Sequence, residues 1–161
     1  MKIVILRDPR ESAKKCSLIP LKERADVEFL RFERGREFDV GEAVLLAHDA
    51  PALSPGDRGK PLFVLDSSWS HLPELRRAVK GAPLPRSIPA GFVTAYPRKS
   101  KLYEDPSSGL ASIEALFLAT VVLGEPDLSL LKDYYWRAEF LKKNERALFL
   151  CGFQPELKGN S

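Results

Sequence analysis

Short apolar runs, each bounded by charged residues, glycine or proline, dominate the first part of the chain. Four of them are clear, and a fifth candidate is richer in glycine and alanine. They occupy residues 2–6, 27–32, 43–47, 62–65 and, as the fifth candidate, 91–95. Near-continuous apolar strands separated by longer connections are typical of a parallel sheet that is covered on both faces. The pattern therefore predicts an α/β fold with a parallel sheet in the N-terminal part.

Apolar residues also occur at helical spacing, in one segment between predicted strands and then through most of the rest of the chain. The predicted helices cover residues 68–80, 110–123 and 127–150. Ser68 is a plausible cap for the first, and residues 124–127 (Gly-Glu-Pro-Asp) separate the other two. We therefore expect an α/β sheet part at 1–95 and a helical part at 96–161, packed together as one compact unit.

Composition excludes several classes of protein. The length of 161 residues fits one domain, and its two cysteines, Cys16 and Cys151, cannot form a disulfide framework. No Cys-x-x-Cys or His-x-x-x-His pair occurs, so we expect no metal. The apolar run near the amino end is too short to cross a bilayer, so we expect no membrane partner. These observations favour a cytoplasmic protein, which we expect to be a monomer.

The net charge of +3 says little, but its distribution is uneven. The stretch from residue 76 to residue 101 holds basic side chains and no acidic one. The basic residues are Arg76, Arg77, Lys80, Arg86, Arg98, Lys99 and Lys101. This stretch predicts a partner that carries phosphate groups. A solvated helix face followed by a basic loop, with no partner, explains the charge equally well.

Familiar catalytic loops are absent: there is no Gly-x-Ser-x-Gly, no Gly-x-x-x-x-Gly-Lys-Ser/Thr and no Gly-x-Gly-x-x-Gly. Sheets of this class bind ligands beyond the carboxyl ends of their strands. Asp8, His48 and the stretch 66–69 (Asp-Ser-Ser-Trp) follow three of the predicted strands.

Each of these candidates also has a purely structural explanation. Asp66 fits a helix cap and Trp69 a core aromatic residue. A solvated or capping role is favoured for both His48 and His71. Cys16 follows two lysines that could lower its pKa, but no base is identifiable beside it, so a nucleophilic role is the minor interpretation.

Five short segments, taken together in their order and spacing, resemble the small-subunit ribosomal RNA aminocarboxypropyltransferases. They are residues 15–17 (Lys-Cys-Ser), 53–58, 65–69, 110–116 and 135–144. The chain is also similar to the related DTW-domain transferases, which modify tRNA uridine. It departs from the ribosomal family at Leu18, where a glycine is usual, and in the loop 94–100, and it lacks the cysteine cluster of the DTW proteins.

The resemblance implies a SPOUT-like fold with a C-terminal knot. It also implies S-adenosylmethionine as cofactor and transfer of its 3-amino-3-carboxypropyl group to a uridine or pseudouridine in rRNA or tRNA. Asp66 is then the expected catalytic or orienting group, and Lys15 and Arg86 are expected to meet RNA together with the other basic residues of the 76–101 stretch. The residues expected at the cofactor are Ser17, Leu45, Ala47, Leu65, Trp69, Leu110, Ser112 and Ala115.

Three other functions stay open at this stage. A SPOUT-type RNA methyltransferase would use the same cofactor and partner but expose the methyl carbon. An RNA-binding or ribosome-assembly module could keep the fold without the chemistry. A small-molecule enzyme of unrelated mechanism is the third, because fold alone does not fix function.

Overall fold

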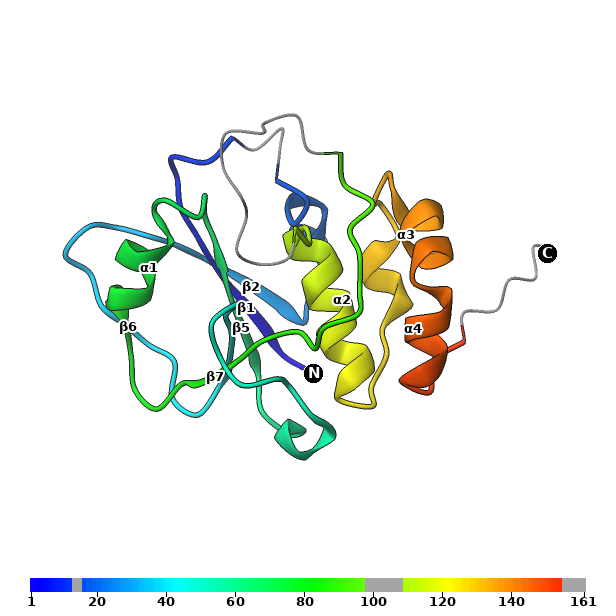
Figure 1. The fold of residues 1–161 in the computed structure, drawn as a ribbon. Coiled ribbons are helices and arrows are strands. Elements are labelled where there is room, and N and C mark those ends of the chain that lie inside the picture. The colour runs from blue at the N-terminus through cyan, green and yellow to red at the C-terminus, as the bar shows by residue number, and fades with distance from the viewer. Residues whose placement is uncertain (13–15, 98–108, 155–161) are drawn as a thin grey trace.

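A five-stranded sheet forms the middle layer of the protein (Figure 1). The computed structural model describes residues 1–12, 16–97 and 109–154. Across the sheet the strand order is β2-β1-β5-β4-β7, and every neighbouring pair is parallel. Its strands are β1 (Ile3–Arg7), β2 (Val27–Arg31), β4 (Val44–Leu46), β5 (Leu62–Asp66) and β7 (Leu84–Arg86). The predicted α/β fold with an N-terminal parallel sheet is confirmed.

Four of the five predicted strands are present, and the fifth is wrong. Residues 91–95 form no strand, and the last strand is β7, seven residues earlier at its start. Two prolines in and beside β7 made this strand hard to predict from the sequence, because proline cannot donate to a strand ladder and is confined largely to sheet edges. Pro85 pairs in register with Leu45 at such an edge. A separate two-stranded sheet joins β3 (Phe38–Asp39) to β6 (Val79–Lys80).

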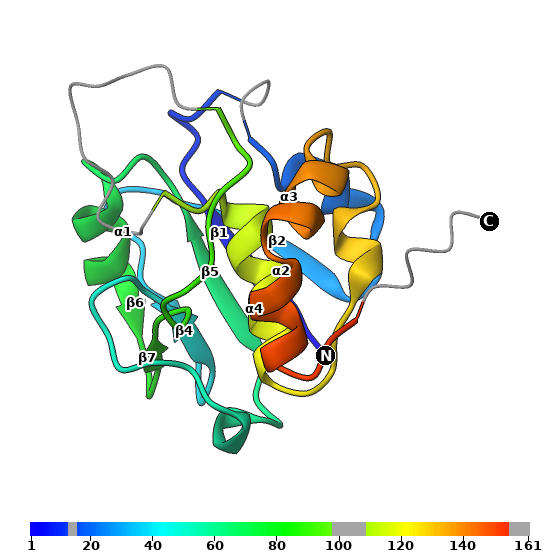
Figure 2. The same ribbon diagram turned by 45° about the vertical axis from the view of Figure 1, so that its right-hand side comes forward.

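The two faces of the sheet carry alternate side chains of the same strands. Ile5 and Val64 pack into the larger apolar cluster, together with α2 (Ser112–Val122). Phe63, from the next position along β5, packs into a smaller cluster under α1 (Leu72–Ala78). Figures 1 and 2 show α1 on one side of the sheet and the C-terminal helices on the other. Burial on both faces explains why β1 and β5 are apolar up to their last residues.

Helix α2 is apolar around its whole circumference, which is typical of a helix with no solvent-facing side. It packs against the sheet on one side and the last helices on the other (Figure 2). The helix ends at Val122, and two residues beyond it Gly124 has a φ of 80°, in the left-handed region. There the Gly124 N–H bonds the Val121 carbonyl and the Glu125 N–H bonds the Thr120 carbonyl, a Schellman arrangement.

The segment predicted as one helix at 127–150 is three shorter pieces. They are a 3-10 turn at Leu128–Leu131, α3 (Arg137–Lys143) and α4 (Glu145–Leu150). Asp127 caps the first by accepting from the Ser129 N–H at 3.1 Å. Asn144 lies between α3 and α4, and its side chain bonds backbone groups, which competes with a continuous helix. The C-terminal part is thus helical, as expected, and the knot stays a prediction.

Helix α1 is shorter than predicted, and Ser68 does not cap it. The residue before the helix is His71, and Ser68 instead bonds the side chains of Ser70 and His71. Two further 3-10 turns lie at Ile19–Glu23 and Pro55–Asp57. In the described ranges, no helix combines the length and apolar character needed to cross a membrane.

Candidate functional site

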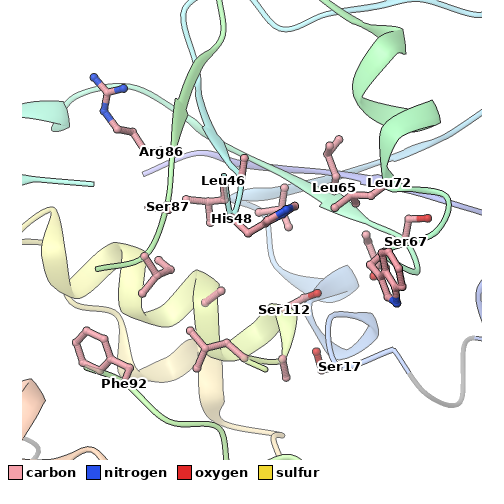
Figure 3. A pocket seen from close by; sticks show the side chains of 18 of the residues that line it. Ser17, Leu46, His48, Leu65, Ser67, Leu72, Arg86, Ser87, Phe92 and Ser112 are labelled. Carbon is pink, nitrogen blue, oxygen red and sulfur yellow. The ribbon is translucent and has the colours of Figure 1, made fainter. Parts of the chain in front are cut away.

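A cavity of about 580 Å³ opens where β4, β5 and β7 end (Figure 3). Its walls come from the segments that follow these strands and from the start of α2. Parallel sheets offer ligand sites at this edge, because the loops beyond the strands diverge there.

Most residues that the resemblance assigned to the cofactor lie around this one cavity, although they come from four separate segments. Those lining it are Ser17, Ala47, Leu65, Trp69, Leu110, Ser112 and Ala115. Leu45 does not line it. Its side chain packs with Phe63 in the cluster under α1, and the next residue, Leu46, faces the cavity instead.

Some lining residues were missed by the sequence reasoning. The segment 87–92, which follows β7, forms part of the wall. Had β7 been predicted, this segment would have been a candidate for the site, because it follows the carboxyl end of a strand. His48, for which a solvated or capping role was favoured, also lines the cavity (Figure 3).

Trp69 is not a core aromatic residue. It is 45% exposed, and it lines the cavity directly after the turn that leaves β5. A large aromatic surface that stays partly exposed in a concave site is available for a ligand to cover.

Asp66 is the last residue of β5 and is buried at the cavity wall. The Cys16 thiol donates to its Oδ2 at 3.0 Å, and Arg7 Nε lies 3.5 Å from the same oxygen. Burial raises the pKa of Asp66, and the nearby carboxylate of Asp8 adds to the rise. The Cys16 hydrogen bond and the Arg7 charge oppose it without cancelling it. Asp66 is therefore a better proton acceptor than an exposed aspartate.

Cys16 lines the cavity as a hydrogen-bond donor, not as a nucleophile. Burial raises the pKa of its thiol, and the hydrogen bond to the Asp66 carboxylate raises it further. The expectation that neighbouring lysines lower this pKa is wrong. A protonated thiol keeps Asp66 Oδ2 partnered and carries little of the reactivity of a thiolate.

Asp8, directly after β1, has a different environment from Asp66 although both carboxylates are buried. Its Oδ1 accepts from Arg10 Nε at 2.8 Å and from the Arg10 N–H at 2.9 Å, and its Oδ2 accepts from the Ser67 hydroxyl at 2.9 Å. Burial alone would raise the pKa of Asp8, but these hydrogen bonds outweigh it and the pKa is lowered. Asp8 therefore stays ionised and supports the site from behind, since it does not line the cavity.

The start of α2 is held at the cavity by one distant side chain, Ser17, and by one of its own, Glu114. The Ile113 N–H donates to Ser17 Oγ at 3.2 Å, across 96 positions of sequence. Glu114 is fully buried, and its Oε1 accepts from the Ala111 N–H at 2.7 Å. Glu114 thus caps the start of α2, and Ser17 supplies the acceptor for the Ile113 N–H.

Glu114 also fastens the segment that leads away from the cavity. The Thr94 hydroxyl donates to its Oε1 at 2.7 Å, and the Ala95 N–H and the Tyr134 hydroxyl donate to its Oε2 at 2.9 Å each. One carboxylate thus joins the cavity wall, α2 and the helical part.

Asn144 bonds the same segment at Val93, the residue before Thr94. Its Oδ1 accepts from the Val93 N–H and its Nδ2 donates to the Val93 carbonyl, both at 2.8 Å. The residues expected to form a fifth strand are therefore held by side chains, in place of a neighbouring strand.

The residues expected at RNA fall into two groups. Lys15, Arg98, Lys99 and Lys101 lie outside the described residues. Of the others, Arg77 is exposed, and three meet acidic partners from other segments. The pairs are Arg76 with Asp49 at 2.7 Å, Lys80 with Glu37 at 3.7 Å and Arg86 with Asp57 at 3.1 Å.

Arg86 borders the cavity, but its guanidinium points away from the other labelled side chains (Figure 3). The basic stretch seen in the sequence is thus largely neutralised where the structure describes it. Over the described part of the chain, no group of three or more His, Cys, Asp or Glu side chains is placed to hold a metal ion.

Comparisons with known proteins point to one fold. No protein-family model matches the sequence, and no curated protein matches it significantly. Among solved structures, the chain is similar to the SAM-dependent rRNA:acp-transferase Tsr3 from Vulcanisaeta distributa. The match has a TM-score of 0.70 at 22% sequence identity and covers 92% of this chain and 80% of the other. At this identity the likeness concerns the fold, so the chain has the same fold as that enzyme.

Proposed function

We propose that this protein transfers the 3-amino-3-carboxypropyl group of S-adenosylmethionine to a uridine or pseudouridine in rRNA or tRNA. One observation carries the proposal. Seven residues expected at the cofactor on sequence grounds line a single cavity, together with Asp66. The fold is also that of a chain described as a SAM-dependent rRNA:acp-transferase.

The residues present fit S-adenosylmethionine. The cavity volume of about 580 Å³ lies in the range of roughly 300–1,000 Å³ that is usual for small-molecule sites. Leu46, Leu110 and Ala115 offer apolar surface to the adenosine. The ring face of Trp69 can attract a positive charge, and so can the negative charge of the Asp66 carboxylate. The bound cofactor supplies a sulfonium, whose sulfur is a good leaving group for any of its three carbons.

Selection among those carbons is then a matter of position. Trp69 would form an apolar wall over the methyl carbon and leave the aminocarboxypropyl carbon open to in-line attack. Ser112, at the start of α2, and Ser17, whose side chain contacts that start, would bind the polar end of that group. Most of the catalysis would come from holding the two reactants in this geometry.

Asp66 would take the proton that the uracil ring must lose. When the ring nitrogen forms its bond to carbon, the carbon–sulfur bond breaks and the N–H proton leaves. A buried carboxylate with a raised pKa, held by Cys16 and Arg7, is suited to receive it.

Replacing Trp69 with alanine is expected to weaken S-adenosylmethionine binding by about 1–3 kcal/mol, because the ligand loses an aromatic contact. Calorimetric titration measures this directly. Tyr135→Ala, which removes an exposed aromatic residue that does not line the cavity, is the control and should leave the affinity unchanged. Equal affinity in wild type and Trp69→Ala would remove Trp69 from the site.

The transfer rate is expected to fall as pH decreases through the pKa of Asp66, because only the ionised form accepts a proton. Since burial raises this pKa, the acid limb of the kcat–pH profile should have its midpoint above the value of about 3.9 that is usual for aspartate. Steady-state rates across the acidic range test this. A midpoint at or below the usual value would exclude Asp66 as the base.

The first experiment is a calorimetric titration with S-adenosylmethionine, S-adenosylhomocysteine and methylthioadenosine. Binding of the methyl-bearing sulfonium in preference to the homocysteine form supports a cavity built around the methyl group. Incubation with RNA and cofactor labelled in either the methyl or the aminocarboxypropyl group then distinguishes the two transfers. Label from the methyl group in RNA would indicate a methyltransferase, and no binding of any of the three ligands would contradict the proposal.

A further inference from the structure

The two carboxylate oxygens of Asp66 have different surroundings. Oδ2 accepts from the Cys16 thiol at 3.0 Å and lies 3.5 Å from Arg7 Nε. Oδ1 accepts no hydrogen bond from any residue in the ranges 1–12, 16–97 and 109–154, and it stays accessible to solvent. Because Asp66 lines the cavity, Oδ1 is the oxygen available to a ligand there.

The Cys16 thiol is the directional partner of this carboxylate. Arg7 Nε is buried, and it donates no hydrogen bond to any residue that the structure describes. The Arg7 guanidinium donates instead through Nη2 to the Glu11 carbonyl at 3.2 Å, so it acts on Asp66 through its charge. A nearby charge has little preference for the rotation of a carboxylate about its Cβ–Cγ bond, whereas a hydrogen bond favours one rotation.

Cys16 is held in place by the residues that follow it. Ser17 accepts from the Ile113 N–H at 3.2 Å and lines the cavity as well (Figure 3). Leu18 is fully buried in the larger apolar cluster. Two consecutive side chains therefore connect the end of β5 with the start of α2, and the thiol has a fixed position relative to Asp66.

Charged and titratable groups face Asp66 from several parts of the described chain. They are Arg7, Asp8 and Cys16 beside it, and His48, Arg86 and Tyr96 on the other walls of the cavity. Burial raises the pKa of Asp66, and the hydrogen bond from Cys16 is the largest contribution that opposes this rise. Removing the thiol is therefore expected to raise the pKa of the carboxyl further.

We propose that Cys16 is a positioning residue for Asp66, whose Oδ2 it holds so that Oδ1 faces the ring nitrogen of the bound uracil. This inference rests on the proposed function in taking Asp66 as the proton acceptor. As the bond from the ring nitrogen to carbon forms and the carbon–sulfur bond breaks, the N–H proton passes to Oδ1. The thiol keeps its own proton throughout. A carboxylate without this contact would turn away from the ring nitrogen for part of the time, which lowers the rate.

The test compares three cysteine variants. Cys16→Ala removes the donor, and Cys16→Ser keeps a donor on a side chain of similar size. Cys151→Ala, at an exposed cysteine that does not line the cavity, is the matched control. The measured quantities are kcat and KM for transfer to RNA across the acidic range. Circular dichroism and titration with S-adenosylmethionine check that each variant is folded and binds the cofactor.

Cys16→Ala is expected to lower kcat roughly tenfold with KM little changed, and to move the acid limb of the kcat–pH profile to higher pH. Cys16→Ser should recover most of both effects, and Cys151→Ala should match wild type. A wild-type kcat and a wild-type acid limb in Cys16→Ala would overturn the inference. Cys16→Ser that performs no better than Cys16→Ala would also overturn it, because the thiol would then only fill space.

A second measurement needs no catalysis. Cys151→Ser leaves Cys16 as the single cysteine of the chain, so reaction with iodoacetamide follows this thiol alone. Burial raises the pKa of Cys16, and the Asp66 carboxylate raises it further. Adding Asp66→Asn should therefore make alkylation at pH 8 at least roughly threefold faster, through a lower midpoint of the rate–pH curve and an unchanged plateau. Asp133→Asn, at an exposed aspartate, is the control and should leave the curve unchanged. Identical curves with and without Asp66→Asn would contradict the contact.

The two measurements separate this inference from the proposed function. If transfer proceeds and Cys16→Ala behaves as wild type, Cys16 does not position Asp66 and the proposed function stands. If no aminocarboxypropyl group reaches RNA but alkylation of Cys16 responds to Asp66→Asn, the proposed function fails while the thiol still holds the carboxylate.

Discussion

Replacing Glu114 with alanine is expected to lower the free energy of unfolding by about 3–5 kcal/mol. The carboxylate is fully buried and accepts four hydrogen bonds, two of them from the backbone N–H groups of Ala95 and Ala111. Alanine leaves these donors, and the hydroxyls of Thr94 and Tyr134, without their acceptor. Urea denaturation measures the loss as a lower midpoint with an unchanged slope.

The matched control is Glu125→Ala, which removes an exposed glutamate just beyond the end of α2. It should change the free energy of unfolding by no more than about 0.5 kcal/mol. A loss below about 1 kcal/mol in Glu114→Ala would mean that water or a neighbouring group replaces the carboxylate. The joint between cavity wall and helical part would then not depend on this residue.

Replacing Asp66 with asparagine is expected to lower kcat for group transfer by about 10²–10⁴-fold. Asparagine keeps the size of the side chain and a carbonyl oxygen that can accept from Cys16, but it cannot take a proton. The effect should therefore fall on kcat more than on KM. Single-turnover transfer to RNA, with calorimetric titration of the cofactor beside it, separates chemistry from binding.

Asp133→Asn, at an exposed aspartate in the helical part, is the control for loss of one carboxylate. It should leave both kcat and cofactor affinity unchanged. If Asp66→Asn lowers cofactor affinity and leaves kcat intact, Asp66 serves as the partner of the sulfonium charge and the proton leaves by another route.

The apolar pattern of the sequence was sufficient to predict most strands of the sheet but not the edge strand β7. β1 and β5 are buried on both faces, so every position before their last residues, Arg7 and Asp66, is apolar and the strands are evident. β7 contains Pro85 and is held at one edge only, where the apolar requirement is weaker. The segment at 91–95 is apolar because it packs near α2, but its backbone is bonded to the side chains of Asn144 and Glu114. A pattern of apolar residues cannot distinguish a backbone that is bonded to a neighbouring strand from one that is bonded to side chains.

The lining of the candidate site was predicted from the resemblance, whereas its electrostatics depended on the fold. No spacing in the sequence indicates that Cys16 donates to Asp66 or that Arg7 lies beside them. Likewise, the acidic residues that pair with Arg76 and Lys80 come from segments tens of positions away. Charge clusters in sequence therefore overstate the basic surface near α1.

The hydrogen bond from Ile113 to Ser17 spans 96 positions, and the pair of bonds between Val93 and Asn144 spans 51. The cavity is lined by residues from Cys16 to Ala115, so it lacks a wall in any partly folded chain in which the sheet has formed and α2 has not docked. A ligand of this cavity binds the chain with α2 docked better than the chain without it, so its binding free energy stabilises the docked state. The stoichiometry of ligand binding in a titration thus measures which fraction of a protein sample has this cavity.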